Sequence, residues 1–122
     1  MRDLSSLPNL TVALIQTSLV WQDRQGNYDH FETLLDQAKG ADLVILPEMF
    51  TTGFAMEAAK QSLPEADVVE WMHARAAQTQ ALIAGSAALQ TEHGAVNRFL
   101  LVEPDGTVHH YDKRHPVSYT HL

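Results

Sequence analysis

Apolar residues at the start of the chain follow first the period of a strand and then that of a helix. Residues 10–17 (LTVALIQT) are mostly apolar, which is typical of a buried strand. From Asn27 the spacing becomes helical, and Gly40 stands where a helix commonly ends. We interpret Asn27 as the N-cap of this helix. The helical face would consist of Tyr28, Phe31, Leu34, Leu35 and Ala38.

A second strand and a second helix follow. Residues 41–46 (ADLVIL) form a short apolar run that Pro47 ends. A strand, a helix and a strand that is apolar on both faces are typical of a parallel sheet covered by helices. After a loop over residues 48–56, we expect a helix over residues 65–80 and a strand over residues 81–89. The buried face of that helix would carry Val68, Val69, Met72 and Ala76.

The last third of the chain predicts a β-hairpin. Residues 95–103 and 107–111 are two largely apolar segments separated by Pro104, Asp105 and Gly106. A Pro-Asp-Gly sequence between such segments is a specific turn signal. The pattern therefore predicts an α/β fold with a mixed sheet, parallel in its early strands and antiparallel in its late ones.

Composition narrows the class of protein. The chain has 122 residues and a formal net charge of −7, and an acidic protein of this kind repels nucleic-acid backbones. No apolar run approaches the length of a membrane span, and the N-terminus lacks the apolar segment of a signal peptide. We therefore expect a cytoplasmic protein that binds neither nucleic acid nor membrane. The chain contains no cysteine, so it has no disulfide and no thiol nucleophile.

Glu48 is the first candidate for chemistry, since it directly follows a predicted buried strand. Ligands of open α/β sheets bind beyond the carboxyl ends of strands, and a carboxylate that is partly desolvated there is a better base. Phe50 and Phe54 lie in the same loop and would line an apolar substrate pocket around this acid. The alternatives are a surface Glu48 that caps the loop and two rings that pack beneath it.

Lys113 is the second candidate. It lies in an Asp-Lys-Arg-His sequence over residues 112–115, which by itself favours a solvated charge cluster. The functional interpretation is a cation near Glu48 that stabilises an oxyanion or donates a proton to a leaving amine.

Four histidines near the end of the chain raise a metal-binding module as an alternative. They are His109, His110, His115 and His121. Adjacent residues of a strand point to opposite faces, so His109 and His110 cannot bind one ion together. We therefore expect no metal site.

Two segments of the chain resemble the signatures of the nitrilase, or carbon–nitrogen hydrolase, superfamily. Residues 46–50 (LPEMF) with residues 51–54 (TTGF) resemble the first signature, and residues 111–115 (YDKRH) resemble the second. Residues 82–86 (LIAGS) and 96–98 (VNR) resemble the stretch between them. The order and spacing are most similar to the omega-amidase branch.

The resemblance implies a fold and a mechanism. The fold is an α-β-β-α sandwich that dimerises through its helices, of which this chain would form the N-terminal half. Glu48 would match the general base and Lys113 the residue that stabilises the tetrahedral intermediate. A cysteine would attack a small carboxamide, the ω-amide of a 2-oxo acid such as 2-oxoglutaramate, and release ammonia. No metal or organic cofactor is implied.

The chain also departs from the family pattern. The family's cysteine lies well after the lysine motif, so residues 1–115 would be a partial hydrolase domain without its nucleophile. Residues 116–122 (PVSYTHL) do not resemble the family, and we interpret them as a non-native tail. The chain alone is therefore expected to be inactive and, with one sheet face uncovered, poorly soluble. A non-catalytic α/β binding domain, with Glu48 and Lys113 as an ion pair, is the alternative.

Overall fold

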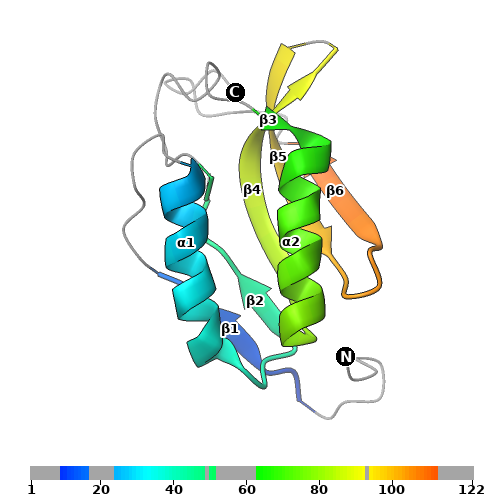
Figure 1. The fold of residues 1–122 in the computed structure, drawn as a ribbon. Coiled ribbons are helices and arrows are strands. Elements are labelled where there is room, and N and C mark those ends of the chain that lie inside the picture. Colours follow the sequence, from blue (N-terminus) through cyan, green and yellow to red (C-terminus); the bar gives the residue numbers. More distant parts are fainter. Residues whose placement is uncertain (1–8, 17–23, 49, 52–62, 93, 113–122) are drawn as a thin grey trace.

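The chain folds into one mixed sheet with two helices packed on the same face, as a computed structural model shows (Figure 1). The structure describes residues 9–16, 24–48, 50–51, 63–92 and 94–112. In these residues the sheet has six strands in the order β1-β2-β4-β5-β6, and β3 also pairs with β4. The strands are β1 (Val12–Leu14), β2 (Leu43–Ile45), β3 (Leu63–Pro64), β4 (Leu82–Thr91), β5 (Gly94–Val102) and β6 (Val108–Asp112).

The direction of the strands changes at β4. Strands β1, β2 and β4 pair in parallel, whereas β4–β5 and β5–β6 are antiparallel. The β5–β6 turn is closed by a hydrogen bond from the Gly106 amide to the Glu103 carbonyl (2.9 Å), and Gly106 has a φ of 96°. Asp105 accepts the Thr107 amide at 2.8 Å, which holds the pKa of its carboxyl below the usual range. The predicted hairpin and the mixed sheet are thus confirmed.

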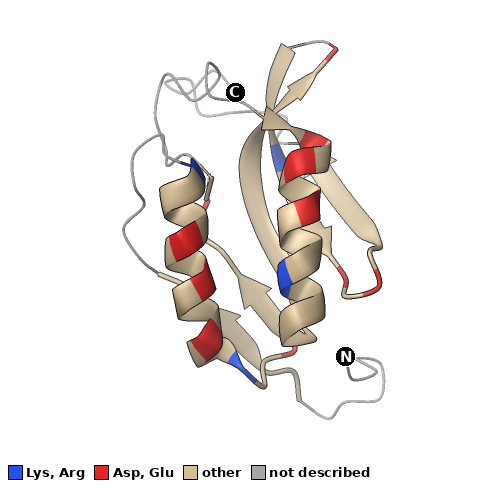
Figure 2. Cartoon of the chain, in the orientation of Figure 1, with Lys and Arg blue, Asp and Glu red and all other residues tan. Residues whose placement is uncertain are grey.

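Helix α2 (Glu65–Thr79) follows the prediction closely. Val68, Met72 and Ala76 recur every fourth residue and are fully buried, while Val69 is half-buried. Acidic Glu65 in the first turn complements the positive end of the helix dipole. Acidic residues are spread along both helices, so much of the chain's negative charge lies on the helical layer (Figure 2). No helix within the described ranges is long and apolar enough to span a membrane.

Helix α1 (Arg24–Leu35), which continues into a short 3-10 helix (Asp36–Ala38), begins earlier than the sequence predicted. Asn27 is therefore not an N-cap. It lies within α1, is 1% exposed, and donates a hydrogen bond from Nδ2 to the Thr51 carbonyl at 2.9 Å. This long-range bond satisfies the side chain, which a local pattern does not reveal.

The core lies between the helices and one face of the sheet. Leu100 and Val102 of β5 are fully buried in one cluster with Ile83 of β4 and Met72 of α2. The alternate residues point to the opposite face, because side chains of a strand alternate. That face is here called the open face.

Large apolar side chains are exposed on the open face. Val12 and Leu14 of β1 are 46% and 60% exposed. Phe99 and Tyr111 are directly opposite each other on β5 and β6 and are 42% and 61% exposed. The helices that the structure describes therefore lie on one side of this sheet, which agrees with half of a four-layer sandwich.

Candidate active site

Glu48 lies three residues beyond β2, on a segment that is fixed to β4 on both sides. The Leu46 amide donates to the Ala84 carbonyl (2.8 Å), and the Phe50 amide donates to the Ser86 carbonyl (3.1 Å). Because β1, β2 and β4 are parallel, this segment leaves the sheet at the carboxyl ends of its strands. The structure thus places Glu48 at the edge where α/β sheets bind ligands.

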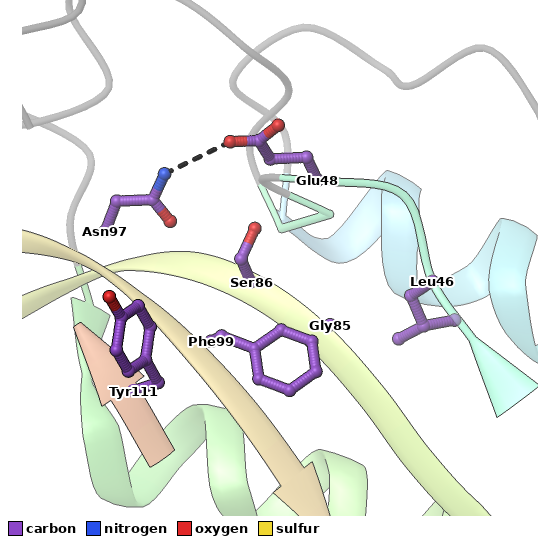
Figure 3. Close-up of a pocket in the computed structure, with 7 residues that line it drawn as sticks. All are labelled: Leu46, Glu48, Gly85, Ser86, Asn97, Phe99 and Tyr111. Carbon is purple, nitrogen blue, oxygen red and sulfur yellow. Dashed lines mark hydrogen bonds between the residues drawn. The ribbon is translucent and has the colours of Figure 1, made fainter. Parts of the chain in front are cut away.

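A pocket of about 390 Å³ opens beside Glu48 (Figure 3), a volume in the range of small-molecule sites. It is lined by Leu46, Glu48, Gly85, Ser86, Asn97, Phe99 and Tyr111. Phe99 and Tyr111 form its apolar side, and Ser86 points its hydroxyl toward the same space as the Glu48 carboxylate. The pocket therefore combines an apolar wall with one acid and two neutral polar groups.

Asn97 is a polar partner of Glu48. Its Nδ2 donates a hydrogen bond to Glu48 Oε1 at 3.3 Å, which is long for this type of bond. Asn97 is 4% exposed, whereas Glu48 is exposed. The pocket opens on the face of the sheet that the described helices leave uncovered.

Phe50 does not line the pocket, contrary to the expectation for a substrate-binding residue. Its ring is fully buried in the core and lies 5.9 Å from the Phe31 ring in an edge-on arrangement and 5.7 Å from the Trp71 ring. Gly85 leaves the space for this ring, since a Cβ added there would lie 2.9 Å from Phe50 Cδ1. Phe50 thus anchors the segment that carries Glu48. Phe54 lies outside the described residues.

Lys113 also lies outside the described residues, which end in this region at Asp112. Asp112 is held by Arg98 in a two-pronged ion pair, with Nε–Oδ1 at 2.5 Å and Nη2–Oδ2 at 2.9 Å. Arg98 also contacts Glu65 of α2 at 3.1 Å. The hydrogen bond with Arg98 lowers the pKa of Asp112, and the same bond raises the pKa of Arg98. The residue before Lys113 is therefore tied to both the sheet and α2.

The described histidines do not gather into a metal site. His109 and His110 lie opposite Leu101 and Leu100 on β6 and so face opposite sides of the sheet. His109 pairs with Glu103 at 2.9 Å. No group of three or more potential ligands that could hold a metal ion occurs in the part of the chain that the structure describes.

The fold is that of a carbon–nitrogen hydrolase, and the comparison with known proteins agrees: residues 11–122 match the carbon–nitrogen hydrolase family, and the chain belongs to it. Residues 116–122 fall within this match, and their interpretation as a non-native tail stays a prediction.

Curated relatives lie in the omega-amidase branch. The chain is 62% identical over 109 residues to omega-amidase YafV of Escherichia coli and 54% identical to that of Yersinia enterocolitica. Each match covers 89% of this chain and 43% of the relative, so the chain spans less than half the length of these proteins. The resemblance to this branch is thus confirmed.

A solved structure supports the same assignment. XC1258 from Xanthomonas campestris, described as a CN-hydrolase superfamily protein with an arsenic adduct in the active site, superimposes with a TM-score of 0.85 and 44% identity. The match covers 89% of this chain and 42% of that one. An N-terminal amidase with a TM-score of 0.77 and 18% identity shares the fold.

Sequence reasoning named Glu48 but assigned no role to Asn97 or Ser86. Asn97 lies in residues 96–98, which resemble the family. The sequence pattern that could have indicated Asn97 is a polar residue inside the apolar strand β5, two positions before Phe99 and therefore on the same open face. A buried polar side chain needs a partner, and here that partner is Glu48.

Proposed function

We propose that this chain supplies the acid–base part of an omega-amidase site, which hydrolyses the ω-amide of a 2-oxo dicarboxylic acid such as 2-oxoglutaramate. The observation that carries the proposal is Glu48, bonded to Asn97 over a small-molecule pocket at the carboxyl end of β2. The omega-amidase relatives support the substrate class. Pairing of two copies through the helices and a cytoplasmic location stay predictions.

The β5–β6 register supports the second role, that of Lys113. The last described pair of β5 and β6 is Arg98 with Asp112. Asn97 comes directly before Arg98 in the sequence, and Lys113 comes directly after Asp112. Asn97 bonds Glu48, so Asp112, the residue before Lys113 in the sequence, lies on the strand beside the one that carries a partner of the acid.

The proposed chemistry assigns one proton-transfer role to each group. Glu48 accepts the proton of a thiol, and the thiolate attacks the carboxamide carbon. Lys113 stabilises the oxyanion that forms and donates a proton to the departing nitrogen as the C–N bond breaks. Water then hydrolyses the acyl-thioester. The thiol must come from outside these 122 residues, which contain no cysteine, so we expect the chain alone to release no ammonia.

A chimera tests the proposal. The 109-residue matching segment of the E. coli omega-amidase is replaced by the corresponding segment of this chain, and ammonia release from 2-oxoglutaramate is measured. We expect the chimera to be active. Glu48→Gln or Lys113→Ala should each lower kcat by about 10²–10⁴-fold, the usual contribution of a general acid or base.

Two exposed residues provide matched controls. Glu70→Gln changes a carboxylate on α2, across the sheet from the pocket, and Lys39→Ala removes an ammonium that follows the 3-10 helix. Both should keep the activity of the parent chimera. A folded chimera without activity would overturn the proposed function, and near-normal turnover by Glu48→Gln or Lys113→Ala would overturn that residue's role.

A further inference from the structure

We infer that Asn97 is a positioning residue, which holds the Glu48 carboxylate in its working place over the pocket. The inference rests on the proposed function of Glu48. Asn97 does not need to touch the substrate for this role. It acts through the hydrogen bond from its Nδ2 to Glu48 Oε1, at 3.3 Å (Figure 3).

Asn97 can position another group because its own backbone is fixed. It lies inside β5 and pairs with Ala88, a fully buried residue of β4. The next residue, Arg98, points to the other face and is bonded to both Asp112 of β6 and Glu65 of α2. The position of Asn97 is thus set by three neighbouring elements.

Glu48 lies outside any strand and is exposed, and a glutamate side chain has several rotatable bonds. A general base works only when it lies within hydrogen-bond reach of the proton that it removes. A fixed donor restricts the carboxylate to fewer positions and so favours that geometry.

The chemistry of an amide suits this role. The NH₂ group of Asn97 donates a hydrogen bond to a carboxylate without adding charge to the site. Aspartate has nearly the same shape but only acceptor oxygens when ionised. An Asn97→Asp variant would therefore keep the packing and replace an attraction by a repulsion.

The competing explanation is that Asn97 is merely a satisfied polar residue of the sheet. Both explanations allow Asn97→Ala to lower stability. They differ in kinetics, because a positioning residue changes kcat through Glu48, and its effect disappears once Glu48 has lost its role.

Kinetics of the chimera separate the two explanations. We expect Asn97→Ala to lower kcat by about 10- to 100-fold, as a small misplacement of a catalytic group does, with little change in KM. Asn97→Asp should lower kcat further and move the acid limb of the kcat/KM profile to higher pH, because a second carboxylate opposes ionisation of the first. Gln90→Ala, an exposed change on β4, should have no effect.

A double variant distinguishes failure of this inference from failure of the proposed function. If Glu48 is the base, Glu48→Gln keeps only a low residual kcat, and adding Asn97→Ala should lower it no further. Full kcat in Asn97→Ala beside a strongly impaired Glu48→Gln would overturn the role of Asn97 alone. An active Glu48→Gln would overturn the proposed function itself.

A measurement on the chain itself keeps the inference testable if Asn97 variants fail to fold. The chain has three asparagines, so selective ¹⁵N labelling gives only three side-chain amide pairs. Glu48→Ala changes an exposed residue and should shift the Asn97 pair upfield, as a lost hydrogen bond does, whereas Glu92→Ala should leave it in place. An Asn97 pair that does not respond to Glu48→Ala would overturn the inference.

Discussion

Gly85 is the position where the fold and the candidate site depend on the same few atoms. A Cβ added there would lie 2.9 Å from Phe50 Cδ1, 3.1 Å from Phe50 Cε1 and 3.2 Å from Leu46 Cβ. The Phe50 ring is fully buried and lies against Phe31, so it has no free space to move into. Gly85→Ala should therefore overpack the core beneath the segment that carries Glu48.

The expected magnitude is the difference of two effects. Overpacking a close-packed core typically costs about 1–3 kcal/mol. Because the neighbours of Gly85 are rigid, we expect a cost of about 2–3 kcal/mol here. Alanine in a strand is preferred over glycine by about 0.5–1 kcal/mol. Gly85→Ala should therefore lower the free energy of unfolding by about 1–2.5 kcal/mol. In a Phe50→Val background, which lacks Cδ1 and Cε1, the same change should be close to neutral.

Urea unfolding followed by tryptophan fluorescence measures this coupling. Trp71 lies 5.7 Å from the Phe50 ring and is a built-in probe, and Trp21→Phe removes the second tryptophan of the chain. Midpoints should shift at a constant m-value. A neutral or stabilising effect of Gly85→Ala in the parent chain would refute the overpacking. An equal cost with Phe and with Val at position 50 would refute the contact with the Phe50 ring, since the two sites would then be independent.

Three further predictions concern charge and exposure. Arg98→Met should cost about 1–2 kcal/mol at neutral pH. The fold lowers the pKa of Asp112, so the ion pair with Arg98 stabilises the folded chain fully above the pKa of an unfolded aspartate, about 4. This stabilisation is lost as the pH falls through the lower pKa of Asp112 in the folded chain. If Arg98→Met still lowers the free energy of urea unfolding at pH 2, this prediction is wrong. Burial raises the pKa of Tyr28 to about 12. Ultraviolet absorbance at alkaline pH should therefore show that this tyrosine ionises at a higher pH than a tyrosine in water, provided that the chain stays folded. Leu14→Lys, on the open face, should raise the solubility of the chain, and a parent chain that sediments as a soluble monomer would count against this.

The sequence was sufficient for those elements whose pattern is local. The α2 prediction over residues 65–80 is within one residue of Glu65–Thr79, because Val68, Met72 and Ala76 repeat at the helical period and face one core. The β5–β6 hairpin was predictable because Gly106 adopts the positive φ that the turn needs. Each of these signals is contained in a few neighbouring residues.

The predictions that were wrong depended on distant contacts. Asn27 has the local features of an N-cap but donates to the carbonyl of Thr51, 24 residues away. Phe50 follows a candidate acid, yet its ring packs into a space left by Gly85 on another strand. Neither partner is visible in a local period, so only the fold could distinguish a pocket wall from a core anchor.

The alternation of β5 explains how one strand serves both stability and chemistry. Asn97 and Arg98 are adjacent and therefore point to opposite faces. Arg98 ties β6 and α2 together on the helical side, and Asn97 reaches Glu48 on the open side. A shift of the β5 register by one residue would exchange the two, placing a guanidinium beside the acid and an amide against the carboxylates of the helical face. The register that buries Leu100 and Val102 in the core is thus the same one that gives Glu48 a neutral partner.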